Sequence, residues 1–293
     1  MLTMRCLRPQ HSQCSRETLP GIQHGWKDTT SAALRYMHQA NGGLLVRIEE
    51  RAMQRTTQAV ILVAGEGKRL RPFTNSNPKC FASVNGKPLL ENALEAFAAA
   101  GCNRIRIVIG HLAAVICQTI TDRFAGMTIE YVYNSDYATT NSMYSLALGL
   151  EGLDAPTWVL EGDVFFEHAI LNIPAPPELA WFVDSSSRHL DGAYVESDPQ
   201  GRALSLKIVR DLRLLQPNQA KSIGMLKLTR KGVQQMQAWL SQGIATGLQN
   251  VYYDLIIGAH MTEGHVHTVD VAGRKWFEID TNEDLKQAER LFA

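Results

Sequence analysis

The chain has 293 residues, 45% of them hydrophobic and 20% charged, and its 29 basic side chains balance 29 acidic ones. This composition excludes a disordered chain, a coiled coil and collagen, and the length allows one substantial core or two small ones. No stretch approaches the roughly 20 apolar residues that cross a bilayer, and no secretory signal is evident, so we expect a cytoplasmic protein without membrane insertion. Zero net charge gives no reason to expect a nucleic acid partner, whereas small phosphorylated molecules need only a few cations.

Residues 1–58 differ in charge from the rest of the chain. They hold eight Lys or Arg and four Asp or Glu, a net charge of +4, which leaves −4 for residues 59–293. They show little hydrophobic periodicity apart from a short helical pattern near residues 32–39. We interpret residues 1–58 as a weakly ordered N-terminal extension, with a regulatory or oligomerisation arm and a true start at Met53 as the alternatives.

Strand-like apolar runs and helical patterns alternate from residue 59 onward. The predicted order is strand 59–64, helix 88–100, strand 104–110, helix 112–124, strand 128–133, helix 142–150 and strand 157–160. This alternation predicts an α/β fold with a Rossmann-like, mostly parallel central sheet flanked by helices, whose ligands bind at the carboxyl ends of the strands. The later part predicts added, partly antiparallel strands. These are strands at 179–183, 192–196, 203–209, 223–228 and 265–271, with helices at 230–242, 250–259 and 281–292.

A glycine-rich, basic segment, residues 63–79, follows the first predicted strand. Gly65 and Gly67 let the backbone approach a ligand and expose successive N–H groups, which form an anion-binding concavity. The segment predicts a polyphosphate cradle, because Arg can hold two oxygens and Lys supplies a point charge. It contains no Walker A motif, and Leu70 stands where the dinucleotide fingerprint has its third glycine. The cations of the segment are Lys68, Arg69, Arg71 and Lys79.

The same segment matches the pattern G-x-G-x-R-L-x-P-x-T-x-x-x-P-K from Gly65 to Lys79. The chain therefore resembles the nucleotidyltransferases that join a nucleoside triphosphate to a sugar phosphate or an alcohol phosphate, which have a nucleotide-diphospho-sugar transferase-like fold. The resemblance runs over residues 59–293 and divides this domain into a nucleotide-binding half, 59–165, and an acceptor-binding half, 166–293. It implies catalytic roles for Arg69 and Lys79. It also implies that the nucleotide contacts Ala64, Gly65, Gly67 and Lys68.

Two carboxylates match further landmarks of this family. Asp163 follows the apolar run 157–160, and Asp280 follows a second apolar run near the last predicted helix. Carboxylates are suitable ligands for Mg²⁺, and the resemblance implies that these two bind it. The alternatives are that Asp163 merely ends a strand and that Asp280 caps the last helix. The five cysteines contain no CxxC pair, so neither zinc nor a disulfide framework is indicated.

The chain looks most similar to the cytidylyltransferases that activate phosphocholine or related aminoalkyl phosphates and phosphonates. Residues 133–146 are similar to the stretch that leads into a helix beside the base in those enzymes. Side chains there can offer donors and acceptors to a pyrimidine edge, and an exposed helix start can face a phosphate. Helix capping is the alternative role. The nucleotide-binding residues expected in this stretch are Asn134, Thr140, Asn141 and Ser142.

A second stretch, residues 252–254, resembles the aromatic and acidic residues that face the aminoalkyl group in the choline-directed enzymes. Aromatic faces and carboxylates stabilise an ammonium. The alternative is that Tyr252, Tyr253 and Trp276 are core or rim aromatics. Asp191 and Gly192 stand where we would align a further aromatic, so a primary ammonium becomes as plausible as a trimethylammonium. The expected acceptor-binding residues are Tyr253, Asp254, Trp276 and Glu278.

The resemblance implies transfer of CMP from CTP, with Mg²⁺, to a small amine-bearing phosphate or phosphonate, with release of pyrophosphate. Phosphoethanolamine, 2-aminoethylphosphonate and an amino-acid-derived phosphate are as plausible acceptors as phosphocholine. A sugar-1-phosphate nucleotidyltransferase is the alternative on the same scaffold, and a non-catalytic regulatory relative is a further one. The sequence leaves a homodimer open.

Overall fold

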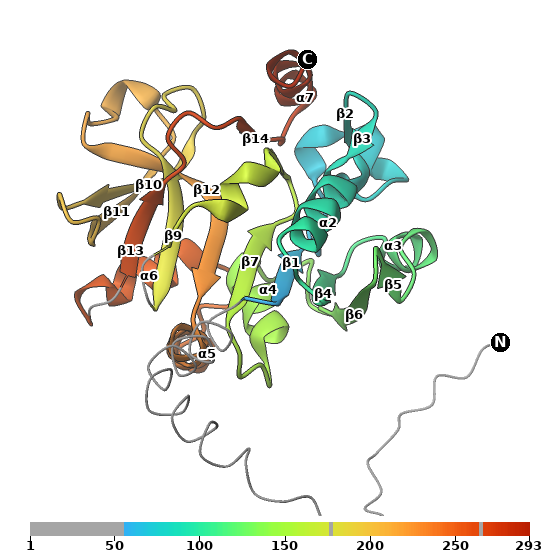
Figure 1. Ribbon diagram of the computed structural model, residues 1–293, viewed down its shortest axis with the longest axis horizontal. Coiled ribbons are helices and arrows are strands. Elements are labelled where there is room, and N and C mark those ends of the chain that lie inside the picture. The colour runs from blue at the N-terminus through green and yellow to red at the C-terminus, as the bar shows by residue number, and fades with distance from the viewer. Residues whose placement is uncertain (1–55, 176–177, 264–265) are drawn as a thin grey trace, which may run out of the picture. The chain divides into compact units, whose positions relative to one another are not determined.

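A computed structural model describes residues 56–175, 178–263 and 266–293, all of which belong to one compact unit (Figure 1). The interpretation of the N-terminal extension lies outside the described residues, except for its last three positions. Gln58, the last residue assigned to that extension, begins the first strand. Among the described residues, no helix has the length and apolar character needed to cross a membrane.

The parallel centre of the main sheet has the strand order β7, β1, β4, β6. These strands are β1 (Gln58–Leu62), β4 (Arg104–Ile109), β6 (Met127–Tyr133) and β7 (Thr157–Glu161). All five residues of β1 are buried, as expected for a parallel strand with helices on both faces of its sheet. The predicted parallel sheet is therefore confirmed, and the carboxyl ends of β1 and β7 lie next to each other.

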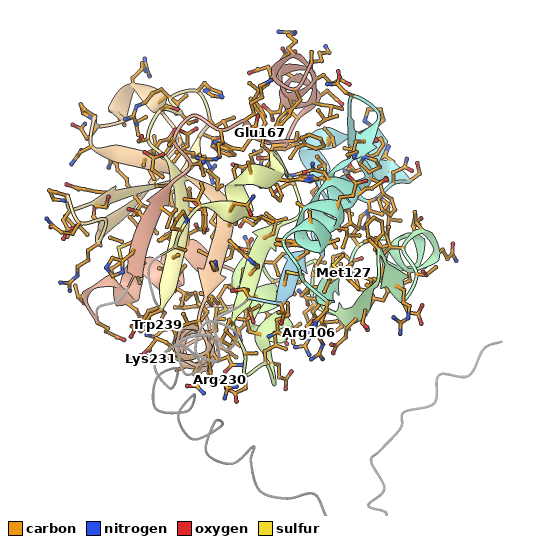
Figure 2. All side chains as sticks on the ribbon, viewed as in Figure 1. Arg106, Met127, Glu167, Arg230, Lys231 and Trp239 are labelled. Atoms are coloured by element: carbon orange, nitrogen blue, oxygen red, sulfur yellow. The ribbon has the colours of Figure 1, made fainter. Side chains whose placement is uncertain are left out.

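Two helices cover the opposite faces of this sheet. They are α2 (Leu89–Ala99) and α4 (Ser142–Leu150). Ile61 packs in the same core cluster as Phe97 of α2, whereas Val60 packs in a second cluster with Leu146 of α4. Arg106, labelled in Figure 2, donates from Nη1 to the carbonyl oxygens of Gly149 and Glu151 at the end of α4. These bonds satisfy carbonyls that the end of a helix leaves without partners.

The second half extends the same sheet with antiparallel strands. β12 (Gln219–Leu228) pairs with β7 and carries the sheet on toward β10 and β11. The expected mixed architecture is confirmed, and the two predicted halves share one sheet. The other strands and helices of this part are β9 (Leu179–Asp184), β10 (Gly192–Ser197), β11 (Ala203–Val209), β13 (Val266–Asp270), α5 (Arg230–Ala245) and α6 (Tyr253–His260).

A separate two-stranded ladder joins distant parts of the chain. β8 (Val164–Phe166) pairs antiparallel with β14 (Trp276–Glu278), and α7 (Asn282–Leu291) follows. The backbone N–H of Ile279 donates to the carbonyl oxygen of Asp163 at 2.9 Å. Phe165 and Phe277 pack in one small apolar cluster beneath this ladder. The ladder therefore sets Asp163 and Asp280 side by side.

Two predicted helices have wrong bounds. The expected helix 112–124 is α3 (Ala113–Thr119), after which the chain is extended and forms β5 (Arg123–Phe124) against β6. The expected helix 250–259 begins only at Tyr253, because backbone groups of residues 249 and 251 bond to the start of α4. Short elements complete the described chain. They are β2 (Ser83–Val84), β3 (Lys87–Pro88) and the 3-10 turns Lys68–Leu70, Phe73–Asn75, Lys79–Phe81, His168–Asn172, Leu212–Leu214 and Met261–Glu263.

Candidate active site

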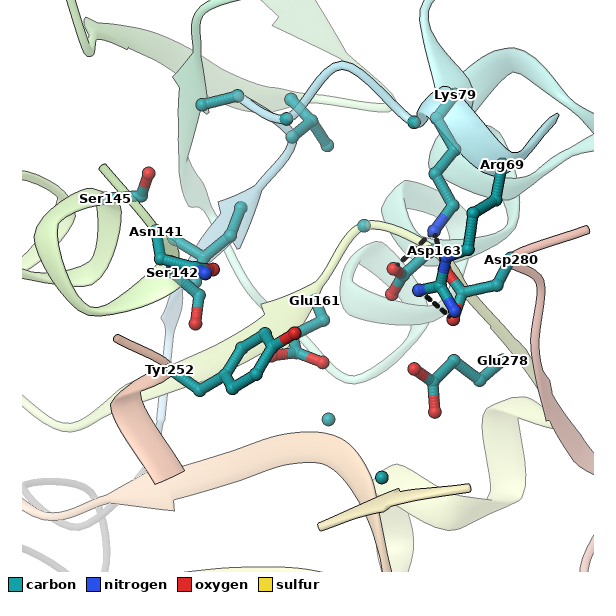
Figure 3. Close-up of a pocket in the computed structure, with 18 of the residues that line it drawn as sticks. Arg69, Lys79, Asn141, Ser142, Ser145, Glu161, Asp163, Tyr252, Glu278 and Asp280 are labelled. Atoms are coloured by element: carbon teal, nitrogen blue, oxygen red, sulfur yellow. Dashed lines mark hydrogen bonds and ion pairs between the residues drawn. The ribbon is translucent and has the colours of Figure 1, made fainter. Parts of the chain in front are cut away.

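A cleft of about 530 Å³ opens at the carboxyl ends of β1 and β7. The loop after β1 and the start of α4 line it on the side of the parallel strands, and β10, β12, the start of α6 and the segment after β14 complete it. Figure 3 shows polar side chains from these elements turned toward one another across the opening. This position agrees with the rule that ligands of open α/β sheets bind beyond the carboxyl ends of the strands.

The glycine-rich loop forms one wall of the cleft. Gly67 has φ of 60°, and a Cβ there would lie 2.9 Å from Cβ of Lys79 and 3.1 Å from Cγ2 of Thr74. Thr74 Oγ1 donates to the carbonyl oxygen of Gly67 at 2.9 Å. No atom lies within 4 Å of a Cβ built on Gly65, which also lines the cleft. Gly67 thus lets the loop fold onto the stem of Lys79, while Gly65 leaves room for a ligand.

Lys79 bridges the two predicted metal-binding carboxylates. Its Nζ lies 2.7 Å from Oδ2 of Asp163 and 2.6 Å from Oδ1 of Asp280, and Nη2 of Arg69 lies 2.7 Å from Oδ2 of Asp280 (Figure 3). Burial opposes the charged form of Lys79, but both carboxylates outweigh it and raise the pKa of Lys79 above its ordinary value. Burial likewise opposes the charged form of Asp280, but Lys79 and then Arg69 lower its pKa. Lys79 and Asp280 are therefore both held in their charged forms.

The last helix leaves Asp280 free for this arrangement. Thr281, rather than Asp280, is the N-cap of α7: its hydroxyl accepts from the backbone N–H of Asp284, whose carboxylate in turn accepts from Thr281 N–H. The capping alternative for Asp280 is therefore wrong.

The carboxylates also form a group suited to a metal ion. Oxygens of Asp163, Glu278 and Asp280 lie within 4.8 Å of one another. Oδ1 of Asp163 is buried and has no hydrogen-bond partner within the described part of the chain. A buried, unpaired carboxylate oxygen is costly unless a cation or donor reaches it. The donor set is hard oxygen, so these residues fit Mg²⁺.

Two more carboxylates line the cleft near the group formed by Asp163, Glu278 and Asp280. Glu161 ends β7, Asp254 lies in the first turn of α6, and both line the cleft with Glu278. Lys221, only 3% exposed, donates to Oε2 of Glu278 at 2.8 Å. Burial raises the pKa of Asp254 to about 6, although the charge of Lys221 acts in the opposite direction. This region offers more carboxylates than cations.

Most of the predicted site residues line the cleft. Those that do are Ala64, Gly65, Gly67, Lys68, Arg69, Lys79, Thr140, Asn141, Ser142, Asp163, Asp254, Glu278 and Asp280. The start of α4 also confirms the capping alternative, because Oδ1 of Asn141 accepts from the backbone N–H of Ser142. Asn141 therefore caps α4 and also lines the cleft. Elsewhere in the lining, Nζ of Lys68 lies 2.5 Å from Oε2 of Glu66.

Three predicted contact residues lie behind the cleft wall instead. Asn134 is 1% exposed, and its Nδ2 donates to Oγ1 of Thr140 and Oγ of Ser145. Tyr253 is fully buried, and Trp276 is 5% exposed with its Nε1 donating to Oδ2 of Asp184. The core alternative is therefore correct for Tyr253 and Trp276, which do not line the cleft. Direct ligand contact was the wrong expectation for all three.

The sequence reasoning missed several cleft residues. Tyr252 rather than Tyr253 faces the opening, because the backbone N–H of Tyr253 bonds to Oγ of Ser142 and turns its ring inward. Glu161 carried a signal, since it directly precedes the Gly-Asp pair that ends in Asp163. Lys221 and Ser145 had none, because both sit inside elements whose pattern predicts only a strand and a helix.

The family comparison agrees with this site. Residues 59–171 match the model of the MobA-like NTP transferase domain. The predicted resemblance to phosphocholine and aminoalkylphosphonate cytidylyltransferases is confirmed by individual relatives.

One relative is the CMP-5'-(3-aminopropyl)phosphonate synthase of Streptomyces rubellomurinus, 32% identical over 248 residues, which cover 80% of this chain and 39% of that protein. The chain thus spans less than half of this relative's length. A second is the 2-aminoethylphosphonate cytidylyltransferase of Lancefieldella rimae, 25% identical over 78% of this chain and 90% of that protein.

The fold is similar to that of a solved CTP:phosphocholine cytidylyltransferase from Streptococcus pneumoniae. The TM-score is 0.67 at 21% identity, and the match covers 80% of this chain and 99% of that one. The expected nucleotide-diphospho-sugar transferase-like fold class is therefore confirmed.

Proposed function

We propose that the chain transfers CMP from CTP to the phosphate or phosphonate oxygen of a small amine-bearing acceptor and releases pyrophosphate. The observation that carries this proposal is the meeting of Arg69, Lys79, Asp163 and Asp280 within 2.7 Å contacts in one cleft, next to the glycine-rich loop. The names of the relatives support CTP as donor and an amine-bearing phosphonate or phosphate as acceptor.

The proposed reaction needs no covalent enzyme intermediate. The acceptor oxygen attacks the α-phosphorus, and the bond from that phosphorus to the β-phosphate bridging oxygen breaks, so pyrophosphate leaves with the electron pair. The loop at Gly65 and Gly67, with Arg69, would hold the departing phosphates, and Lys79 would neutralise the α-phosphate. The protein acts mainly by positioning two anions and offsetting their repulsion.

Mg²⁺ is part of the proposal. Asp163 and Asp280 would hold the ion, and it would supply electrostatic stabilisation of the phosphate oxygens. The unpartnered Oδ1 of Asp163 supports this assignment within the described residues.

The acidic end of the cleft supports an amine-bearing acceptor over a sugar phosphate. Glu161, Asp254 and Glu278 line this end, and carboxylates stabilise an ammonium, whereas a sugar needs several hydroxyl partners. The retention of Arg69 and Lys79 in contact with the carboxylates argues against a non-catalytic relative.

The remaining expectations stay predictions. They are the division into halves at residue 165, the cytoplasmic location, the lack of nucleic acid partners and the open question of a homodimer.

The test is pyrophosphate release by the purified chain with Mg²⁺, across four nucleoside triphosphates and a panel of acceptors. The panel holds phosphocholine, phosphoethanolamine, 2-aminoethylphosphonate and several sugar 1-phosphates. We expect one dominant pair of CTP and an amine-bearing acceptor. Turnover with sugar phosphates alone would move the chain to the sugar branch, and no turnover with any pair would contradict the proposal.

A further inference from the structure

The ammonium group of Lys79 contacts the same two carboxylates that are expected to hold the metal ion. Its Nζ lies 2.7 Å from Oδ2 of Asp163 and 2.6 Å from Oδ1 of Asp280. The second oxygen of Asp280 lies 2.7 Å from Nη2 of Arg69. Figure 3 shows both cationic side chains directed at this pair of carboxylates. Each oxygen of Asp280 thus contacts a cation, and a metal ion that uses Asp280 must share or replace one of these contacts.

The stem of Lys79 is fixed, whereas its end is not. A Cβ built on Gly67 would lie 2.9 Å from Cβ of Lys79 and 3.2 Å from its Cδ, so the stem packs on the glycine-rich loop as far as Cδ. Thr74 Oγ1 donates to the carbonyl oxygen of Gly67 and closes this loop. Only Cε and Nζ extend further toward the carboxylates. The ammonium group can therefore exchange partners with little rearrangement of the loop.

The formal charges of the four side chains balance. Lys79 and Arg69 face Asp163 and Asp280, two cations against two anions. A divalent ion added to this group would lie next to the Lys79 ammonium, and like charges at contact distance repel strongly in a partly buried site. A polyphosphate removes this conflict, because its anionic oxygens offer new partners to both cationic side chains.

We propose that Lys79 is an exchangeable counter-ion of the metal site, whose ammonium holds Asp163 and Asp280 until a polyphosphate draws it away. This inference rests on the proposed function and names how binding in the same cleft is regulated. No proton moves and no covalent bond changes in this exchange. Lys79 thereby makes the binding of divalent metal and of nucleotide interdependent, and each ligand raises the affinity for the other by the same factor.

Lys79 controls the exchange more than Arg69 does. The Lys79 side chain is 15% exposed and contacts both carboxylates. The Arg69 side chain is 59% exposed and contacts Asp280. An exposed ion pair contributes little, because water and salt screen it. Removal of the Lys79 charge should therefore free the carboxylates for metal more than removal of the Arg69 charge.

The test measures metal binding without turnover. Calorimetry gives the affinity for Mn²⁺ in the absence of nucleotide for the wild type, Lys79→Met, Lys79→Gln and Arg69→Met. Lys87→Met is the matched control, because Lys87 also pairs with a carboxylate, Glu95 at 2.5 Å, but is not part of the cleft lining. Thermal melting with a chelator checks that each variant is folded. Melting with Mn²⁺, with CTP and chelator, and with both ligands measures their interdependence.

We expect both neutral Lys79 variants to bind Mn²⁺ at least ~10-fold more tightly than the wild type when no nucleotide is present. Arg69→Met should gain less, and Lys87→Met should gain nothing. Adding Asp163→Asn to Lys79→Met should abolish the gain, which would place the ion at this pair of carboxylates. In the wild type, Mn²⁺ and CTP together should raise the melting temperature by more than the sum of their separate shifts. This excess should shrink in Lys79→Met.

Three outcomes would overturn the inference. They are Mn²⁺ binding by both neutral Lys79 variants that is no tighter than in the wild type, an equal gain in Lys87→Met, and additive melting shifts in the wild type. Failure of the proposed function looks different, because no acceptor would then release pyrophosphate from any nucleoside triphosphate. The Mn²⁺ affinities are measured without acceptor or turnover, so the two failures can be distinguished.

Discussion

The Nζ atom of Lys79 lies 2.6 Å from Oδ1 of Asp280, 201 positions away in the chain. The same atom lies 2.7 Å from Oδ2 of Asp163. The glycine-rich loop, the end of β7 and the segment before α7 are thus tied together by one ammonium group. The contact joins the residue that would face the α-phosphate to the residues that would hold the metal.

Lys79→Ala should lower turnover at least ~10²-fold, the scale seen when one preorganised charge-stabilising group is removed from an active site. The variant also leaves Asp163 and Asp280 facing each other without the cation between them. We therefore expect Mg²⁺ to raise its melting temperature more than that of the wild type. Pyrophosphate release and thermal melting with and without Mg²⁺ check both statements. Near-normal turnover would remove Lys79 from the mechanism.

Gly67→Ala should destabilise the loop and lower activity together. Its positive φ costs alanine about 1 kcal/mol, and the added Cβ would press on Lys79 and Thr74. Gly65→Ala is the matched control, since a Cβ there meets no atom within 4 Å and its φ is not positive. Urea unfolding of both variants measures the difference. Equal stability of the two would contradict the packing argument.

Asp254→Asn should change the pH dependence of stability. Burial raises the pKa of Asp254 to about 6 from an ordinary 3.8, so the folded protein binds this proton more tightly than the unfolded chain. Asp254 therefore destabilises the fold progressively as pH rises from about 4 to 6, by about 3 kcal/mol above that window.

The asparagine variant should consequently gain stability over the wild type as pH rises through this range. Urea unfolding at closely spaced pH values measures the gain, and Asp154→Asn, at an exposed position, is the control. A constant difference across pH 4 to 7 would show that Asp254 keeps its ordinary pKa.

The sequence predicted which charged residues lie in the cleft better than how they meet there. Arg69, Lys79, Asp163 and Asp280 could be identified because each follows a strand or occupies a fixed place in the glycine-rich motif. Their meeting depends on the β8–β14 ladder, which has only three residue pairs and joins segments far apart in the chain. No local sequence pattern predicts a strand pairing as short as this one.

The residues on the acceptor side of the cleft were harder to predict from the sequence, for a different reason. Whether Tyr252 or Tyr253 faces the cleft depends on where α6 begins, and that start is fixed by backbone bonds to the beginning of α4. Lys221 lies in a strand whose alternation would suit a buried apolar residue equally well. The ion pair of Lys221 becomes visible only in the structure, because its partner Glu278 comes from a different strand, β14.

Asp163→Asn should weaken metal binding as well as turnover. The substitution removes charge from a carboxylate whose buried Oδ1 has no partner among the described residues, without changing its size. We expect at least a ~10²-fold loss of turnover and weaker binding of Mn²⁺, measured directly by calorimetry in the absence of acceptor. Asp211→Asn, in the turn after β11 and not part of the cleft lining, should change neither quantity. Unchanged Mn²⁺ binding in the Asp163 variant would place the metal elsewhere.

Asn134→Ala should impair nucleotide binding although Asn134 does not line the cleft. Its Nδ2 donates at 3.1 Å to both Oγ1 of Thr140 and Oγ of Ser145, which do line it. Since Asn134 already donates to the Ser145 oxygen, the Ser145 hydroxyl proton is directed elsewhere and can point to an acceptor atom of the base. Removing Asn134 frees the Ser145 hydroxyl to rotate, whereas the Thr140 hydroxyl still donates to the carbonyl oxygen of Asp136. The KM for CTP should therefore rise about 10-fold while the KM for the acceptor stays within about twofold. Asn134→Ser, which keeps a donor nearby, should recover part of the loss. A rise confined to the acceptor KM would refute this positioning role.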